Sequence, residues 1–197
     1  MGRKVIAITD GDQLAEKAVA KIAEKIGARF ISRSAGNPTP LSGRELVEMI
    51  KGTPHDPVVV LLDDRGHHGV GKGEAALAYL AKHPDIELIG VVAVASNIPG
   101  AKGTPVDFSI TNEGKIYKGP VNKDGDPSEE RFLTGDTVSV LPELSVPLIV
   151  GTGDTGKMGG KDAHQAGSPI TLKAVETILT KVEELNRDRQ ETGEKRN

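Results

Sequence analysis

The segment Val58–Glu74 has the sequence VVVLLDDRGHHGVGKGE, and it decides the fold class. Its first five residues are apolar, which is typical of a strand buried on both faces of a parallel sheet. Asp63-Asp64-Arg65 and a glycine-rich loop follow, and a helical pattern then begins. In open α/β sheets, turns of this kind at the carboxyl ends of parallel strands form the ligand site. We therefore expect an α/β fold with a ligand site at this edge.

The same arrangement of strand, polar turn and helix recurs along the chain. Strands are predicted at Lys4–Thr9, Arg29–Ser32, Val58–Leu62, Ile86–Ala95 and Val146–Val150. Helices are predicted at Gln13–Ile26, Ser42–Lys51, Glu74–Lys82, Thr134–Leu144 and after Ser168, which is the expected N-cap of the last helix. Asp12 is the expected N-cap of the first helix, and Ser42 with Glu45 predicts a capping box.

These elements predict one three-layer α/β/α domain over residues 1–185, with a mostly parallel, Rossmann-like sheet for which a Toprim-like variant stays open. The rhythm breaks between about 98 and 134, where Val106–Thr111 and Lys115–Gly119 predict a β-hairpin that elaborates the sheet. Residues 186–197 are charged and lack apolar anchors, so we expect a frayed tail.

The composition excludes several classes of function. The chain of 197 residues has no Cys, which excludes disulfides and thiolate metal sites. Its net charge of −3, with two Tyr, three Phe and no Trp, gives no reason to expect nucleic-acid binding. The longest apolar run, Ile89–Ala95, is far shorter than the ~20 residues that span a bilayer. We expect a protein made in the cytoplasm that meets membranes only through partners.

A divalent metal site is one interpretation of the acids that follow the strands. Asp10 and Asp12 follow the first strand, and Asp63 and Asp64 follow the third. Carboxylate oxygens suit Mg²⁺ or Ca²⁺, and such a site would favour phosphoryl-transfer or hydrolytic chemistry. The alternative is structural: Asp12 caps its helix and Asp64 pairs with a neighbouring Arg.

Anion binding is the second interpretation. Gly66–Lys72 and Gly151–Lys157 both match G-x-x-x-x-G-K, but Gly73 and Met158 follow where a phosphate-binding loop needs Ser or Thr. What remains is a set of amides, a helix start and polar side chains that favour a small anion such as a carboxylate. The candidate ligand-binding residues are Arg33, Asn37, Arg65, Lys72, Asn97 and Lys157.

Six blocks taken together resemble one known family. They are ITDGD, FISRSAGNPTPLSG, PHDPVVVLLDDRG, GKGEAAL, HPDIELIGVVAVASN and PLIVGTGD. In this order, from about Lys4 to Val182, the chain resembles the stage V sporulation protein AE family, specifically its soluble AEa type. The resemblance implies a protein of spore-forming Firmicutes that is encoded with the other stage V A proteins. Those proteins move dipicolinic acid and calcium into the developing spore and release them in germination.

For this chain, the resemblance implies a non-enzymatic component, peripheral to the spore inner membrane, whose partners are other stage V A proteins, including membrane subunits. Dipicolinate is the candidate small anionic ligand, and Arg33, Arg65 and Lys72 are the groups expected at its carboxylates. No catalytic residues are carried over from the family. The alternative function is a magnesium-dependent phosphoryl-transfer or hydrolytic enzyme that uses the strand-end aspartates.

Overall fold

The computed structural model describes residues 2–67, 70–98 and 100–194, without the side chains of 189–194. The strands are β1 (Arg3–Ile8), β2 (Arg29–Phe30), β3 (Val58–Leu61), β4 (Ile86–Val94), β5 (Phe108–Ile110), β6 (Ile116–Tyr117) and β7 (Ile149–Thr152). The helices are α1 (Gln13–Lys25), α2 (Gly43–Lys51), α3 (Lys72–Lys82) and α4 (Pro169–Glu194), with short 3₁₀ turns at Ser32–Ser34, Leu141–Glu143, Met158–Gly160 and His164–Ala166.

The strands form one open sheet in the order β2-β3-β1-β4-β7-β5-β6. All pairs from β2 to β5 are parallel, and β6 is antiparallel to β5. The predicted hairpin therefore extends the sheet at its β7 side. Because the five predicted core strands run in one direction, their carboxyl ends share one edge, as the sequence predicted.

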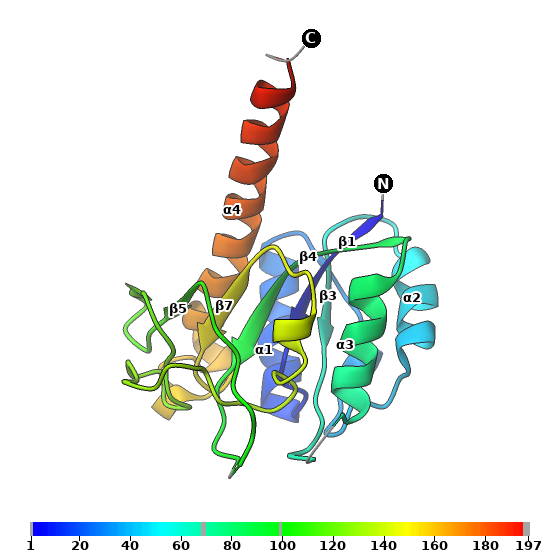
Figure 1. The fold of residues 1–197 in the computed structure, drawn as a ribbon. Helices are drawn as coiled ribbons and strands as arrows, with labels where there is room; N and C mark the ends of the chain where they lie inside the picture. Colours follow the sequence, from blue (N-terminus) through cyan, green and yellow to red (C-terminus); the bar gives the residue numbers. More distant parts are fainter. Residues whose placement is uncertain (1, 68–69, 99, 195–197) are drawn as a thin grey trace.

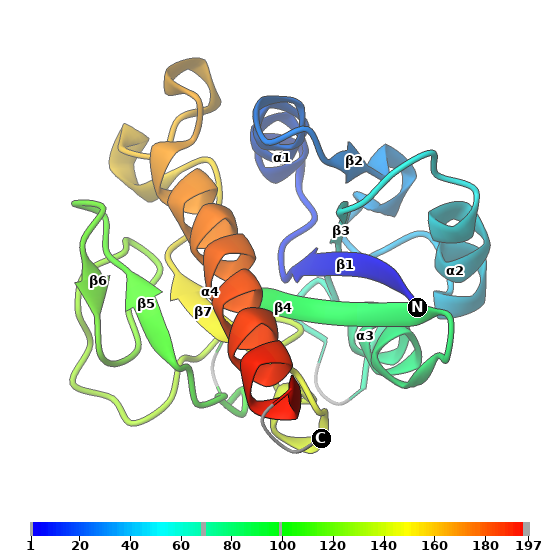
Figure 2. The ribbon, with the colours of Figure 1, turned by 90° about the horizontal axis from the view of Figure 1, so that it is seen from above.

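Helices cover both faces of the sheet (Figures 1 and 2). Successive residues of a strand point to opposite faces, so Ile6 and Ile8 of β1 pack in the core under α1 and α4. Val5 and Ala7 pack on the other side, in the core under α2 and α3. This arrangement confirms the three-layer α/β/α class. Among the described residues, no helix has the length and apolarity that a membrane span requires.

Two of the three helix caps predicted from the sequence are confirmed, whereas the prediction of Ser168 as the N-cap of α4 is wrong, because Asp162 accepts the first helix amides instead. The Asp12 carboxylate accepts hydrogen bonds from the amides of Leu14 and Ala15, at 2.8 and 3.0 Å. Ser42 and Glu45 form the complete capping box at the start of α2. Both caps depend on residues two or three positions apart, which is why the sequence alone sufficed to find them.

The prediction of a helix over Thr134–Leu144 is wrong. Only Leu141–Glu143 forms a 3₁₀ turn, and the residues before it form a loop. Thr137 has a φ of 59°, which no α-helix contains. The amides of Asp136 and Val140 donate to Ser96 Oγ and Glu74 Oε1 instead of to helical carbonyls. Contacts with the loop after β4 and with α3 thus replace the helix.

The last helix is longer than its apolar pattern predicted. The pattern ends at Leu185, whereas α4 continues to Glu194 and extends beyond the sheet (Figure 1). Residues 195–197 lie outside the described part of the chain, and the fraying of the tail stays a prediction. Helix α3, which follows the glycine-rich loop after β3, begins at Lys72, two residues earlier than predicted.

Candidate functional site

The loops that follow β1, β3, β4 and β7 meet at the carboxyl edge of the sheet. The chain leaves β1 toward β2 on one side and leaves β4 toward β7 on the other. Adjacent strands whose connections run in opposite directions define the switch point where open α/β sheets bind ligands. The carboxyl ends of β1 and β4, with the loops beside them, are therefore where a ligand site is expected.

The loops after β1 and β3 touch at this edge. A Cβ built on Gly11 would lie 2.6 Å from Cβ of Asp63 and 2.3 Å from the carbonyl oxygen of Gly36, closer than atoms can approach. Gly11 thus lets the chain after β1 pack directly on the start of the β3 loop. All four predicted metal-binding aspartates lie on these two loops.

Lys157 links the β7 loop to the start of α1. Its ammonium lies 2.5 Å from Asp12 Oδ2 and 2.7 Å from Asp154 Oδ1. Burial opposes the charge of Lys157, but the hydrogen bonds with both carboxylates outweigh it and raise the pKa of Lys157. Burial also raises the pKa of Asp12, yet the hydrogen bonds from Lys157 and two helix amides bring that pKa below its usual value. The predicted ligand-binding residue Lys157 is thus already held by two acids.

Asp10 is buried with only half of its carboxylate satisfied. Oδ1 accepts hydrogen bonds from the amides of Gly11 and Asp12, at 2.7 and 3.3 Å. Oδ2 is buried and accepts no hydrogen bond from the described residues. Burial, reinforced by the charge of Asp12, raises the pKa of Asp10 to about 7.

This raised pKa predicts that Asp10→Asn stabilises the protein at alkaline pH. Between the unfolded pKa of 3.8 and the folded value of about 7, folded Asp10 binds a proton that the unfolded chain lacks, so stability falls as pH rises through this window. The amide variant removes that penalty. We expect it to gain on the order of 2 kcal/mol in the free energy of unfolding at about pH 8 and almost nothing at about pH 4, by urea denaturation.

Asp12→Asn is the matched control, with the opposite sign. The pKa of Asp12 is lowered, so its charge contributes stability above the unfolded pKa that is lost as pH falls. This variant should destabilise at neutral pH and approach the wild type in acid. Equal effects of Asp10→Asn at both pH values would contradict the assignment of a buried, proton-binding Asp10.

Asp63 and Asp64 follow β3 and are both buried. Asp63 Oδ1 accepts a hydrogen bond from the amide of Arg65 at 2.6 Å, but burial outweighs it and raises the pKa of Asp63 to about 6. Asp64 accepts from the amides of Gly73 and Glu74, at 2.6 and 3.0 Å. Asp64 therefore caps α3 from outside the helix, and burial raises its pKa as well.

A metal site on these acids stays a prediction. Among the side chains that the structure describes, which exclude those of 189–194, no three or more His, Asp or Glu are grouped as ligands for an ion. The carboxylates of Asp12 and Asp64 accept hydrogen bonds from helix amides. For Asp12, this is the capping role that the structural alternative predicted. Asp64 differs from that alternative because its hydrogen-bond partners are amides rather than an Arg.

The predicted anion-binding residues fall into separate places. Arg65 and Lys72 line one open groove of about 730 Å³, together with Pro38, Gly66 and Gly71. Arg33 lines a different hollow beside Leu41 and Arg44. Asn37 and Asn97 are loop residues that lie outside both of these hollows.

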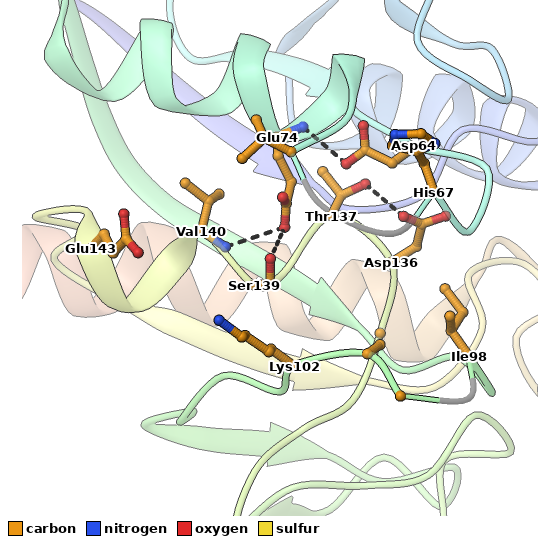
Figure 3. Close-up of a pocket in the computed structure, with 14 residues that line it drawn as sticks. Asp64, His67, Glu74, Ile98, Lys102, Asp136, Thr137, Ser139, Val140 and Glu143 are labelled. Atoms are coloured by element: carbon orange, nitrogen blue, oxygen red, sulfur yellow. Dashed lines mark hydrogen bonds between the residues drawn. The ribbon is translucent and has the colours of Figure 1, made fainter.

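The sequence missed a second cleft at the same edge, with a volume of about 410 Å³ (Figure 3). Asp64 and Glu74 line one wall, and Asp136, Thr137 and Ser139 line another. Because Thr134–Leu144 was predicted to be helical, its polar residues were not expected in a site. The signal was present: Gly135-Asp136-Thr137 is a turn-like sequence.

A family model described as stage V sporulation protein AE1 matches residues 4–182 of the chain. No match was found among curated proteins or among solved structures.

Proposed function

The chain belongs to the stage V sporulation protein AE1 family, and from this premise we propose that it serves the uptake of dipicolinic acid during sporulation and its release in germination. Family membership assigns a role in sporulation. Within that role, we propose a non-enzymatic component, peripheral to the spore inner membrane, that works through contacts with the other stage V A proteins, including membrane subunits, and through a small anion bound at the carboxyl edge.

The observation that carries the anion part is the groove of Arg65 and Lys72. Arg matches a carboxylate with two parallel hydrogen bonds, and Lys adds a compact positive charge. Lys72 is also the first residue of α3, where the helix dipole favours an anion. Since Asp64 already takes the amides of Gly73 and Glu74, the two cationic side chains are the groups that would hold the ligand.

The rim of the groove suits contact with a partner. Val70 borders the groove and is 71% exposed, more than any other large apolar side chain that the structure describes. Arg65 and Lys72 line the groove beside it. An apolar residue that shares a groove with two cations gives a docking partner both burial and charge to recognise.

We expect dipicolinate at about 5 mM to raise the Tm of the protein and Arg65→Ala to abolish that rise. The loss follows from removing the bidentate partner of a carboxylate, which typically weakens binding by about tenfold or more. In sporulating cells, the same variant is expected to lower the dipicolinate content of spores or to delay its release in germination, which absorbance of the released compound measures.

Arg29→Ala is the matched control, because Arg29 is an exposed arginine of β2. It should leave the dipicolinate shift and the spores unchanged. Normal dipicolinate content and release in cells that lack the whole chain would contradict the proposed role. If a variant loses the rise in Tm with dipicolinate but makes normal spores, the proposed ligand is wrong and the proposed role in sporulation stands.

The enzyme alternative rests on the pKa values of Asp10 and Asp63, which lie near neutrality as those of catalytic acids often do. It is the weaker candidate because Asp12 and Asp64 are engaged by helix amides. A magnesium-dependent rise in Tm that Asp63→Asn abolishes would favour it.

A further inference from the structure

The cleft of about 410 Å³ is strongly acidic. Its described lining includes the carboxyl groups of Asp64, Glu74, Asp136 and Glu143, against a single ammonium, that of Lys102. The cleft shares Asp64, His67 and Val70 with the neighbouring groove but contains neither Arg65 nor Lys72. Its field therefore repels the anions that the groove attracts, and a cleft of this charge concentrates cations.

Most carboxylate oxygens in this cleft already accept hydrogen bonds. Both carboxylate oxygens of Asp64 accept hydrogen bonds from the amides at the start of α3. Asp136 Oδ2 accepts from the amide of Gly66 at 2.5 Å, and its Oδ1 accepts from the Thr137 hydroxyl at 3.3 Å. These bonds hold the two aspartates in place as structural parts of the wall.

Glu74 is different, because one of its oxygens is unsatisfied. Its Oε1 accepts from Ser139 Oγ at 2.5 Å and from the amide of Val140 at 3.2 Å. Its Oε2 is buried and accepts no hydrogen bond from the described residues, and the residue is only 3% exposed. Figure 3 shows the Glu74 side chain reaching from α3 into the cleft toward Ser139 and Val140. An orphaned carboxylate oxygen is costly in such a place, and a ligand that donates to it removes the cost.

The geometry selects the kind of cation. Mg²⁺ and Ca²⁺ need several oxygen ligands converging at once, and the described residues offer no such group of three. An ammonium or guanidinium needs only donors that meet separate acceptors. Glu74 supplies one free acceptor, the Ser139 hydroxyl oxygen supplies another, and the remaining acids supply the field.

We propose that this acidic cleft binds a small organic cation, a primary amine or a guanidinium, through Glu74. The volume of about 410 Å³ lies in the range of small-molecule sites. Oε2 is closed to solvent in the free protein, so the proposal requires the Glu74 carboxylate to turn toward the cleft when the cation binds. Lys102 is the like charge that a ligand meets there.

The test uses the full chain, 1,5-diaminopentane as the cation, and 1,5-pentanediol as an uncharged compound of the same length. At constant ionic strength, the diamine at about ten times its Kd is expected to raise Tm by about 3–6 °C, and the diol is expected to have no effect. Glu74→Gln should remove the rise. It keeps the acceptor for Ser139 and Val140, so its own Tm without ligand should equal or exceed that of the wild type.

Glu176→Gln, an exposed change on α4, is the control and should leave the shift intact. Lys102→Met removes the like charge and should tighten binding by about two- to fivefold. The assignment is overturned if the diamine gives no saturable shift, if Glu74→Gln binds it as the wild type does, or if Mg²⁺ or Ca²⁺ at equal concentration gives the larger shift.

Discussion

Replacing Asp162 with alanine is expected to lower Tm by about 8–15 °C, a large effect for one side chain. Asp162 is fully buried. Its Oδ1 accepts from the amides of Ile170 and Thr171, at 2.8 and 3.0 Å, and its Oδ2 accepts from the amide of Gly156 and the hydroxyl of Thr171, at 2.9 and 2.6 Å. The variant leaves four buried donors without their acceptor, which costs about 3–5 kcal/mol.

Two variants make this result specific. Asp162→Asn keeps one acceptor oxygen and should lose less than half as much. Asp124→Ala replaces an exposed aspartate and should change Tm by less than about 2 °C. A loss in Asp162→Ala no greater than that in Asp124→Ala, by thermal denaturation, would show that α4 does not depend on this cap.

Gly73→Ser is expected to destabilise the protein by about 3 kcal/mol or more, although it completes the G-x-x-x-x-G-K-S pattern of a phosphate-binding loop. A Cβ at Gly73 would lie 2.7 Å from the amide nitrogen of Asp63 and 2.9 Å from its carbonyl carbon and oxygen. Backbone atoms cannot give way as a side chain can, so α3 would have to move off the end of β3.

Gly52→Ser is the control for this change. Gly52 ends α2 with helical dihedral angles, φ −75° and ψ −5°, and its nearest neighbours would lie 3.5 Å from a new Cβ. Its effect should be within about 1 kcal/mol. If Gly73→Ser instead kept the wild-type Tm and gained affinity for a nucleoside triphosphate, the interpretation of this loop as a tight structural turn would be wrong.

The elements and their layers were predictable because they depend on local patterns. Apolar runs located β1, β3 and β4, and the spacing of Ser42 and Glu45 located the start of α2. The shared carboxyl edge then followed from the parallel strands. These inferences need only residues that are close together in the sequence.

The partners of the polar residues were not predictable because they come from distant loops. Ser168 was the expected N-cap of α4, but its hydroxyl is buried without a partner among the described residues, and Asp162 accepts the helix amides instead. Asp64 caps α3 from nine residues before Gly73. Sequence rules for helix caps relate residues within about one helical turn of each other. The loops that bring more distant residues together are determined by tertiary packing.

The direction of α4 decides how the protein is best attached to a surface. The helix starts beside the loops of the carboxyl edge and ends past the opposite edge of the sheet (Figure 1). A biosensor chip that captures the protein through an affinity tag added after this helix would leave the groove of Arg65 and Lys72 and the acidic cleft on the side that faces the flowing solution. Both the dicarboxylate and the diamine can then be injected over one immobilised sample.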